Sequence, residues 1–156
     1  MGMDVYGNKP KSTKGEYFRA SVWSWHPIWD YCLDLHPSIA SKVEYGHSND
    51  GDGLKSLDAK TLGKLVLKDI QTGVALDYIN ERKKALDALP LIDCVYCDET
   101  GHRTWLDSSG LETKKICNAC NGERKVKQFA TNYSLHIDHL KEFAEFMIDS
   151  GGFKIW

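Results

Sequence analysis

Four of the five cysteines lie in two C-x2-C pairs, and their spacing indicates metal chemistry. Cys94 pairs with Cys97 and Cys117 with Cys120, with residues 98–116 between the pairs. Four converging thiolates can bind one tetrahedral ion, and soft sulfur ligands favour Zn²⁺, with a lone iron as the main competitor. Because sulfur fills all four positions, none is left for a catalytic water. We therefore expect one structural Zn²⁺.

Other interpretations of the cysteines remain open. A single C-x2-C pair can act as a redox dithiol, and His102 can replace one cysteine as a ligand. The two matched pairs favour the metal, because they already supply four sulfurs. The fifth cysteine, Cys32, lies between apolar neighbours without a partner cysteine, which predicts a small core residue.

The polar loop YGHSNDGDGL at residues 45–54 is a second candidate site. It precedes a predicted helix whose N-terminus can hold an anion, whereas Asp50 and Asp52 can hold a cation. A catalytic version would use His47 as the acid/base, with Asp50 or Asp52 as its partner. The simpler interpretation is a turn-rich connection, because Asn and Asp tolerate left-handed backbone geometry.

Two further segments have the composition of contact surfaces. The stretch YFRASVWSWHPIWDY at 17–31 would bind a protein or stack nucleic-acid bases if exposed, and would form the main core if buried. The segment 101–128 has six Lys and Arg against three Asp and Glu. The candidate partner-binding residues are Trp23, Trp25, Arg19, Lys114, Lys115, Arg124 and Lys125.

The composition excludes several classes of protein. The chain has 156 residues, of which 42% are hydrophobic and 27% charged, and its net charge is −2. It is too hydrophobic for a disordered chain, and no apolar run approaches the roughly 20 residues of a membrane span. Near-neutral charge argues against a general nucleic-acid coat or a membrane-surface binder. The first residues, MGMDVYGNKPKSTKG, lack a signal peptide's apolar stretch, so we expect a cytoplasmic protein.

The sequence patterns of helices and strands predict an α+β fold that positions these residues. We expect a small sheet packed with three to four helices, plus a zinc-stapled β-hairpin. The hairpin is predicted from TWLDSSGLETKKI, which alternates around Asp107–Gly110. Apolar residues at helical spacing predict helices at 57–71, capped by Ser56, at 74–89, at 135–150, capped by Ser134, and from Pro27 to Leu35. Aromatic and β-branched runs predict strands at 3–6, 16–19, 126–131 and 153–156.

These elements imply a body interrupted by an insertion. We expect residues 1–93 to form the N-terminal part of the body and 94–120 to form the zinc-binding hairpin. Residues 121–156 would then complete the body with a strand, a helix and a tail.

The cysteine pairs are followed by residues that complete the segments CVYCDETGHR and CNACNGERKV. These segments resemble the zinc domain of DnaJ-type co-chaperones, in a version with fewer repeat units. The repeating unit of that domain is C-x2-C-x-G-x-G, and Gly101 and Gly122 occupy two of the four glycine positions here. The co-chaperone domain has four units and two zincs, whereas this chain has two units. The resemblance implies zinc binding by the four paired cysteines.

Over its whole length the chain is similar to a group of uncharacterised proteins of phages, prophages and bacterial genomes. The shared features are MGMDVYG, GEYFR, a tryptophan-rich stretch, YGHSNDGDGL, the cysteine pairs and GGF, at 1–7, 15–19, 23–29, 45–54, 94–120 and 151–153. The similarity implies a setting among mobile elements and their hosts, and therefore the bacterial host cytoplasm.

The leading hypothesis is a non-enzymatic zinc-binding protein that binds a macromolecule, with a protein as the favoured partner. The phage setting suggests a host or defence protein. The alternative is a metal-, phosphate- or nucleotide-dependent enzyme or ligand binder that uses the HSNDGDG loop. A third hypothesis is nucleic-acid binding through the basic hairpin. No membrane partner is expected, and the sequence leaves the oligomeric state open.

Overall fold

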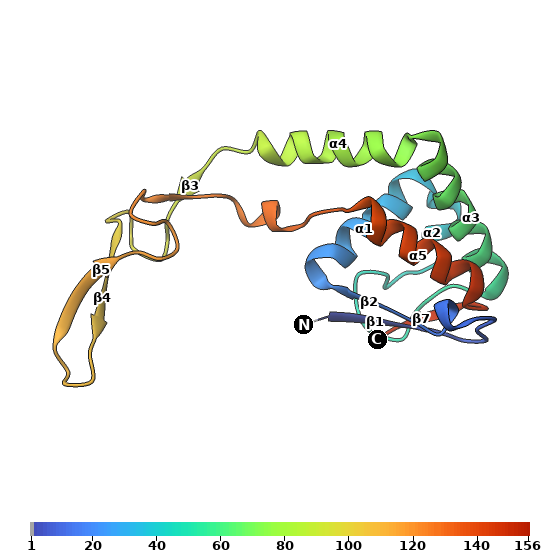
Figure 1. Cartoon of the computed structure of the whole chain (residues 1–156), viewed down its shortest axis with the longest axis horizontal. Coiled ribbons are helices and arrows are strands. Elements are labelled where there is room, and N and C mark those ends of the chain that lie inside the picture. Colours follow the sequence, from blue (N-terminus) through green and yellow to red (C-terminus); the bar gives the residue numbers. More distant parts are fainter. Residues whose placement is uncertain (1) are drawn as a thin grey trace. The chain divides into compact units, whose positions relative to one another are not determined.

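Figure 1 shows the computed structural model of the chain, which describes residues 2–156. Two compact units are present: unit 1 comprises the chain up to Lys83 together with 132–156, and unit 2 comprises 84–131. Unit 1 has a sheet of three strands, β1 (Gly2–Gly7), β2 (Tyr17–Ser21) and β7 (Phe153–Ile155), and the helices α1 (Val22–Leu35), α2 (Pro37–Ala40), α3 (Ser56–Thr72) and α5 (Ile137–Asp149). A short 3-10 helix, η1 (Thr13–Gly15), precedes β2, and the boundary between the units falls within α4 (Val74–Asp87). The α+β fold is confirmed.

The sheet of unit 1 is antiparallel with the strand order β2-β1-β7. Val5 in the middle strand pairs with Phe18 on one side and with Ile155 on the other. All three side chains are buried, because residues directly opposite each other in neighbouring strands point to the same face of the sheet. The strands expected at 3–6, 16–19 and 153–156 are therefore present, with shifted ends.

Aromatic side chains of α1 and α5 form the core of unit 1. The rings of Trp25 and Trp29 stack with centroids 5.8 Å apart, and Phe143 of α5 meets Trp25 edge-on at 5.2 Å. Trp25 is 0% exposed, so its prediction as a partner-binding residue is wrong: the ring is core. Helix α3 packs closely on α5 at Gly63, where a Cβ would lie 2.6 Å from the Ala144 carbonyl oxygen.

Three predicted helix starts are wrong. Helix α1 begins at Val22 rather than Pro27, because the Ser21 Oγ accepts a hydrogen bond from the Ser24 N–H and caps it. Pro27 therefore lies inside the helix, where it removes one backbone hydrogen bond. In α3, Ser56 is the first helical residue instead of the cap. Helix α5 begins at Ile137, and the Ser134 Oγ hydrogen-bonds with the His136 Nε2 rather than with the helix.

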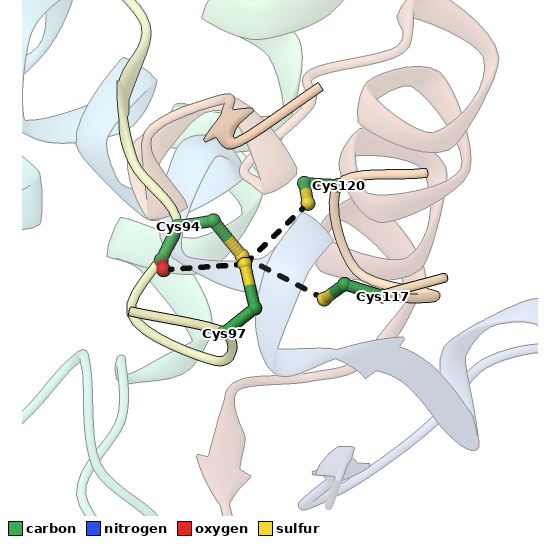
Figure 2. Close-up of side chains that lie close together, drawn as sticks. All are labelled: Cys94, Cys97, Cys117 and Cys120. Carbon is green, nitrogen blue, oxygen red and sulfur yellow. Dashed lines mark hydrogen bonds between the residues drawn. The ribbon is translucent and has the colours of Figure 1, made fainter. Parts of the chain in front are cut away.

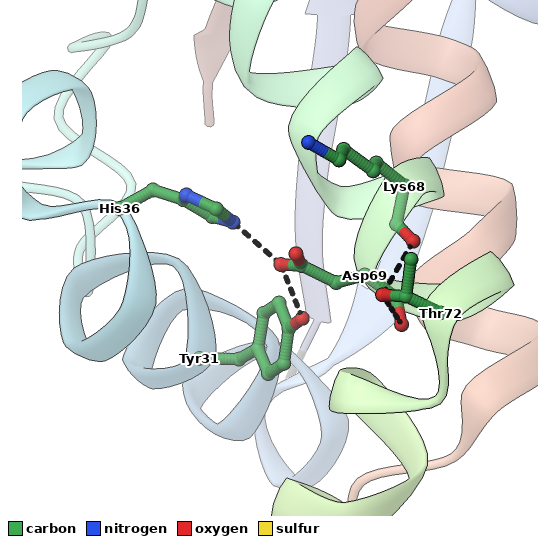
Figure 3. A network of polar contacts seen from close by, with 5 residues as sticks. All are labelled: Tyr31, His36, Lys68, Asp69 and Thr72. Atoms are coloured by element: carbon green, nitrogen blue, oxygen red, sulfur yellow. Dashed lines mark hydrogen bonds and ion pairs between the residues drawn. The ribbon is translucent and has the colours of Figure 1, made fainter.

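A carboxylate ties α1 to α3 in unit 1 (Figure 3). The Asp69 Oδ2 of α3 accepts hydrogen bonds from the Tyr31 hydroxyl at 2.8 Å and the His36 Nε2 at 2.7 Å. Tyr31 is fully buried, so this contact satisfies a hydroxyl that water does not reach.

Unit 2 consists of two strand pairs and little else. Strands β4 (His102–Leu106) and β5 (Glu112–Ile116) form the expected hairpin, and β3 (Ile92–Asp93) pairs with β6 (Lys125–Val126). The strand expected at 126–131 is wrong beyond Val126, because the chain turns into the 3-10 helix η2 (Phe129–Asn132). Within residues 84–131 only the four paired cysteines and Gly101 are buried.

Within residues 2–156, no helix combines the length and the apolar character that crossing a membrane requires.

Candidate metal centre

The structure brings the four paired cysteines together (Figure 2). Their Sγ atoms all lie within 4.8 Å of one another, and all four residues are buried. The Cys94 and Cys117 Sγ atoms are 3.9 Å apart, and those of Cys97 and Cys120 are 3.8 Å apart. Around a tetrahedral zinc with bonds of 2.3 Å, sulfurs are separated by about 3.8 Å. The cluster can therefore hold a metal ion.

The two cysteine knuckles, residues 94–101 and 117–124, share one backbone conformation. In the first, Glu99 and Gly101 have φ of 59° and 76°. In the second, Gly122 and Arg124 have φ of 86° and 67°. These are the four glycine positions of the C-x2-C-x-G-x-G unit. The left-handed backbone is thus adopted at all four, even where Glu99 and Arg124 have side chains that disfavour it.

The knuckles are also joined to each other in a pseudo-symmetric way. The Cys94 N–H donates to the Arg124 carbonyl at 2.8 Å, and the Cys117 N–H donates to the Gly101 carbonyl at 2.9 Å. The first cysteine of each knuckle is therefore bound to the last residue of the other. At Gly101 a Cβ would lie 2.7 Å from the Gly122 carbonyl oxygen, which leaves room for glycine alone.

Backbone groups stabilise the thiolate of Cys117, whereas burial raises the pKa of the neighbouring Cys94 to about 12. Burial acts to raise the pKa of Cys117, but hydrogen bonds from the Cys120 and Ala119 backbone N–H groups outweigh it and lower the pKa to about 7. The thiolate is the form that binds a metal, so Cys117 offers a ligand near neutral pH. His102 contributes no ligand atom to the cluster: its Nδ1 contacts the Thr100 carbonyl at 3.2 Å.

The hairpin places its charged and aromatic residues on two faces. Arg103, Trp105 and Lys115 share one face, since Arg103 pairs with Lys115 across the strands and Trp105 is two residues on. The Arg103 guanidinium lies 4.9 Å from the centre of a Trp105 ring. Lys114, opposite Thr104, lies on the other face. Lys115 and Lys114 are thus both exposed but point in opposite directions.

The other candidate contact residues are dispersed. Lys125 forms an ion pair with Asp93 across β3 and β6, and Arg124 uses its carbonyl to hold the first knuckle. In unit 1, the Arg19 Nε lies 3.6 Å from the Asp4 Oδ1. Trp23 is 40% exposed and its ring centroid is 5.1 Å from that of Tyr133. Trp25 is buried, and the other six candidates are divided between the two units.

The polar loop does not assemble the site expected of it. The Asp52 carboxylate accepts from the Tyr45 N–H at 3.0 Å and the Gly53 N–H at 2.7 Å, so it supports the loop's own backbone. Asp50 accepts from the Ser48 hydroxyl. His47 contacts neither, because its ring faces α1, where it meets His26 and Asp30. The catalytic alternative needs His47 to contact Asp50 or Asp52, and the structure does not bring these side chains together.

Sequence reasoning missed the contact of His47 with α1. His26 and Asp30 are four residues apart, which places them on one helix face. This spacing could have indicated that the two side chains act on a common partner. No local pattern indicated that the loop brings His47 to that face.

Comparison with protein-family models, with curated proteins and with solved structures found no match to this chain.

Proposed function

We propose that unit 2 is a zinc-stabilised interaction module that binds a protein partner, and that its metal has a structural role. The observation that carries the proposal is the buried set of four sulfurs at the separations a tetrahedral zinc requires. Thiolate ligands also suit iron, but zinc has no redox chemistry and is the usual ion of structural sites with four cysteines. Four protein ligands leave no position for a reacting water.

The metal would supply the stabilising free energy that unit 2 does not obtain from buried apolar side chains. A two-stranded hairpin is marginally stable in water, and residues 84–131 bury nothing apolar apart from the cysteines. A bound zinc would therefore provide the folding free energy for the whole unit. A module stabilised from within by a metal can leave its outer side chains for contacts with another molecule.

Those outer side chains are unusually apolar, which supports a protein partner. Seven large apolar side chains of unit 2 are more than half exposed: Val95 at 74%, Leu106 at 71%, Leu111 at 65%, Ile116 at 64%, Phe129 at 64%, Tyr96 at 62% and Leu91 at 55%. Exposed aromatic and aliphatic groups of this kind are typical anchors of protein interfaces. The resemblance to phage and prophage proteins suggests that the partner is a host or defence protein in the bacterial cytoplasm.

A nucleic acid is the second candidate partner, favoured by one observation. Arg103, Trp105 and Lys115 form a hairpin face that combines positive charge with an aromatic ring, as single-strand binders do. However, residues 84–131 contain equal numbers of basic and acidic side chains, and a zinc with four thiolates adds two negative charges. This balance is why a protein is preferred.

The test combines metal analysis with affinity capture. Elemental analysis of protein purified without chelator should give about one zinc per chain, and an iron spectrum or no metal would contradict the assignment. The tagged protein should retain a bacterial protein that Leu106→Ser with Leu111→Ser loses, while Lys60→Ala, an exposed change in α3, retains it. If both variants capture the same proteins, the hairpin is not the interface. Retention of nucleic acid that falls steeply with salt would instead support the second candidate.

A further inference from the structure

Two histidines of unit 1 lie against each other, far along the chain from the cysteine centre. His26 is on α1 and His47 is in the loop between α2 and α3. Their Nδ1 atoms are 2.7 Å apart, and their ring centroids 4.8 Å apart. One turn along α1 from His26, the Asp30 Oδ1 lies 3.2 Å from the His47 Nε2.

The Asp30 carboxylate beside the His47 Nε2 favours the His47 tautomer with its proton on Nε2, which leaves a lone pair on Nδ1. In that tautomer the proton between the two Nδ1 atoms is on His26. A carboxylate that orients an imidazole through its far nitrogen is the arrangement that surrounds histidine metal ligands in proteins.

The surroundings favour the neutral form of His26 and leave the pair accessible. Burial, and then the neighbouring His47, lower the pKa of His26, although Asp30 acts in the opposite direction. A neutral imidazole is the form that binds metals. The side chain of His47 is 41% exposed and that of Asp30 38%, and the Tyr133 ring meets His26 edge-on at 5.7 Å. Ions in solution can thus reach the pair.

We propose that His26 and His47 bind a divalent transition metal ion through their Nδ1 atoms, with Asp30 as the positioning residue for His47. Zn²⁺ is the probe ion because imidazole nitrogen suits it. Two nitrogens on a tetrahedral zinc are separated by roughly 3.3 Å, so the rings must part by about half an ångström and turn until both Nδ1 lone pairs point at the ion. His47 lies on an exposed loop and can make this movement. Neutral His26 shifts its proton from Nδ1 to Nε2, so the number of bound protons does not change.

The protein supplies two ligands, and water or a group from another molecule would complete the shell. This makes the site exchangeable, unlike the closed cysteine centre. Asp50 and Asp52 take no part, since both carboxylates are used within their own loop.

The experiment is a calorimetric titration of Zn²⁺ into the full chain already carrying one zinc per molecule. A second, weaker equivalent is expected at pH 7.5. His26→Ala or His47→Ala should weaken it at least tenfold, and Asp30→Asn by about 10–100-fold. The control, His136→Ala, removes a histidine at the start of α5 and should leave the affinity unchanged.

A second measurement does not depend on substitutions. In an imidazole ¹⁵N–¹H spectrum of the unaltered protein, Zn²⁺ should shift the His26 and His47 resonances ahead of the other histidines. The proposal is overturned if no second equivalent binds up to millimolar zinc. It is also overturned if the second equivalent persists when either His26 or His47 is replaced, or if other histidines shift first.

Discussion

At the residue scale, the backbone of the knuckles is strained at two positions. Both are positions where the C-x2-C-x-G-x-G unit has glycine. Glu99 and Arg124 have left-handed backbone at φ of 59° and 67°, which costs a residue with a Cβ roughly 1–2 kcal/mol. Of the other positive-φ positions in the knuckles, Gly101 and Gly122 are glycines, and Asp98 and Asn121, at φ of 46° and 50°, are residue types that tolerate this region.

Replacing either strained residue by glycine should therefore strengthen metal binding. For Glu99→Gly and for Arg124→Gly we expect a gain of about 1 kcal/mol each, or about fivefold in zinc affinity, because folding of this unit and metal binding are coupled. Competition with a chromophoric chelator measures it. Glu112→Gly, in strand β5, is the matched control and should lower the affinity or leave it unchanged. Equal gains in all three variants would show that backbone strain is not the cause.

The five cysteines should react in a defined order. Burial raises the pKa of Cys32 far above its usual range, so almost no thiolate forms at pH 8 and the side chain is unreactive. In the zinc-loaded protein we expect no rapidly alkylated thiol, in the presence of a chelator four, and in denaturant five. Mass spectrometry after timed alkylation counts them. Early modification of Cys32 in the folded protein would contradict its placement in the core.

At the scale of elements, the contact of α3 with α1 depends on one carboxylate. Asp69→Ala removes the acceptor of both the Tyr31 hydroxyl and the His36 Nε2, and leaves a buried donor without a partner. We expect a loss of about 1–3 kcal/mol in the free energy of unfolding, and a smaller loss for Tyr31→Phe, which removes the donor as well as the bond. Urea unfolding provides the measurement.

Lys68→Ala is the control for that prediction, because Lys68 is the neighbouring residue and its side chain is exposed. It should change stability by no more than about 0.5 kcal/mol. If Asp69→Ala and Lys68→Ala have equal effects, the hydrogen bonds of Asp69 contribute nothing measurable.

Features that depend on residues close together in the sequence were predictable. Features that depend on contacts between residues far apart in the sequence were not. The hairpin and the cysteine cluster follow from spacings within 94–120, and the end of α3 follows from Gly73, which has φ of 88°. The start of α1 is an exception, because Ser21 caps it locally but Pro27 suggested a first turn and the cap was missed. By contrast, nothing near His47 in the sequence indicated that its ring meets α1.

At the scale of the whole molecule, the two units depend on different forces. Unit 1 buries a continuous set of aromatic and aliphatic side chains, whereas the hydrophobic cluster of unit 2 consists of the four cysteines with Val126 packed against them. Stability in unit 1 therefore comes from removing apolar surface from water, whereas in unit 2 the proposed metal would supply it through ligand bonds.

Removal of the metal should accordingly unfold one unit and spare the other. With a strong chelator we expect amide hydrogens of β4 and β5 to lose protection from exchange, while those of β1 and α5 retain it. Exchange measured by mass spectrometry on peptides from both units tests this. The double variant Cys97→Ala with Cys120→Ala should give the same pattern without chelator. Protection of the hairpin that survives both treatments would mean that the metal does not stabilise it.

The hydrogen bond between the Cys117 N–H and the Gly101 carbonyl has a consequence for how this protein can diversify. It closes the chain at the root of the hairpin, so the knuckles are held to each other whatever residues lie between them. Residues 102–116 therefore form a segment that can be exchanged while the two knuckles at its ends stay hydrogen-bonded to each other. Evolution or an experimenter can lengthen, shorten or rewrite them, and so change what is recognised, without disturbing the sulfurs beneath.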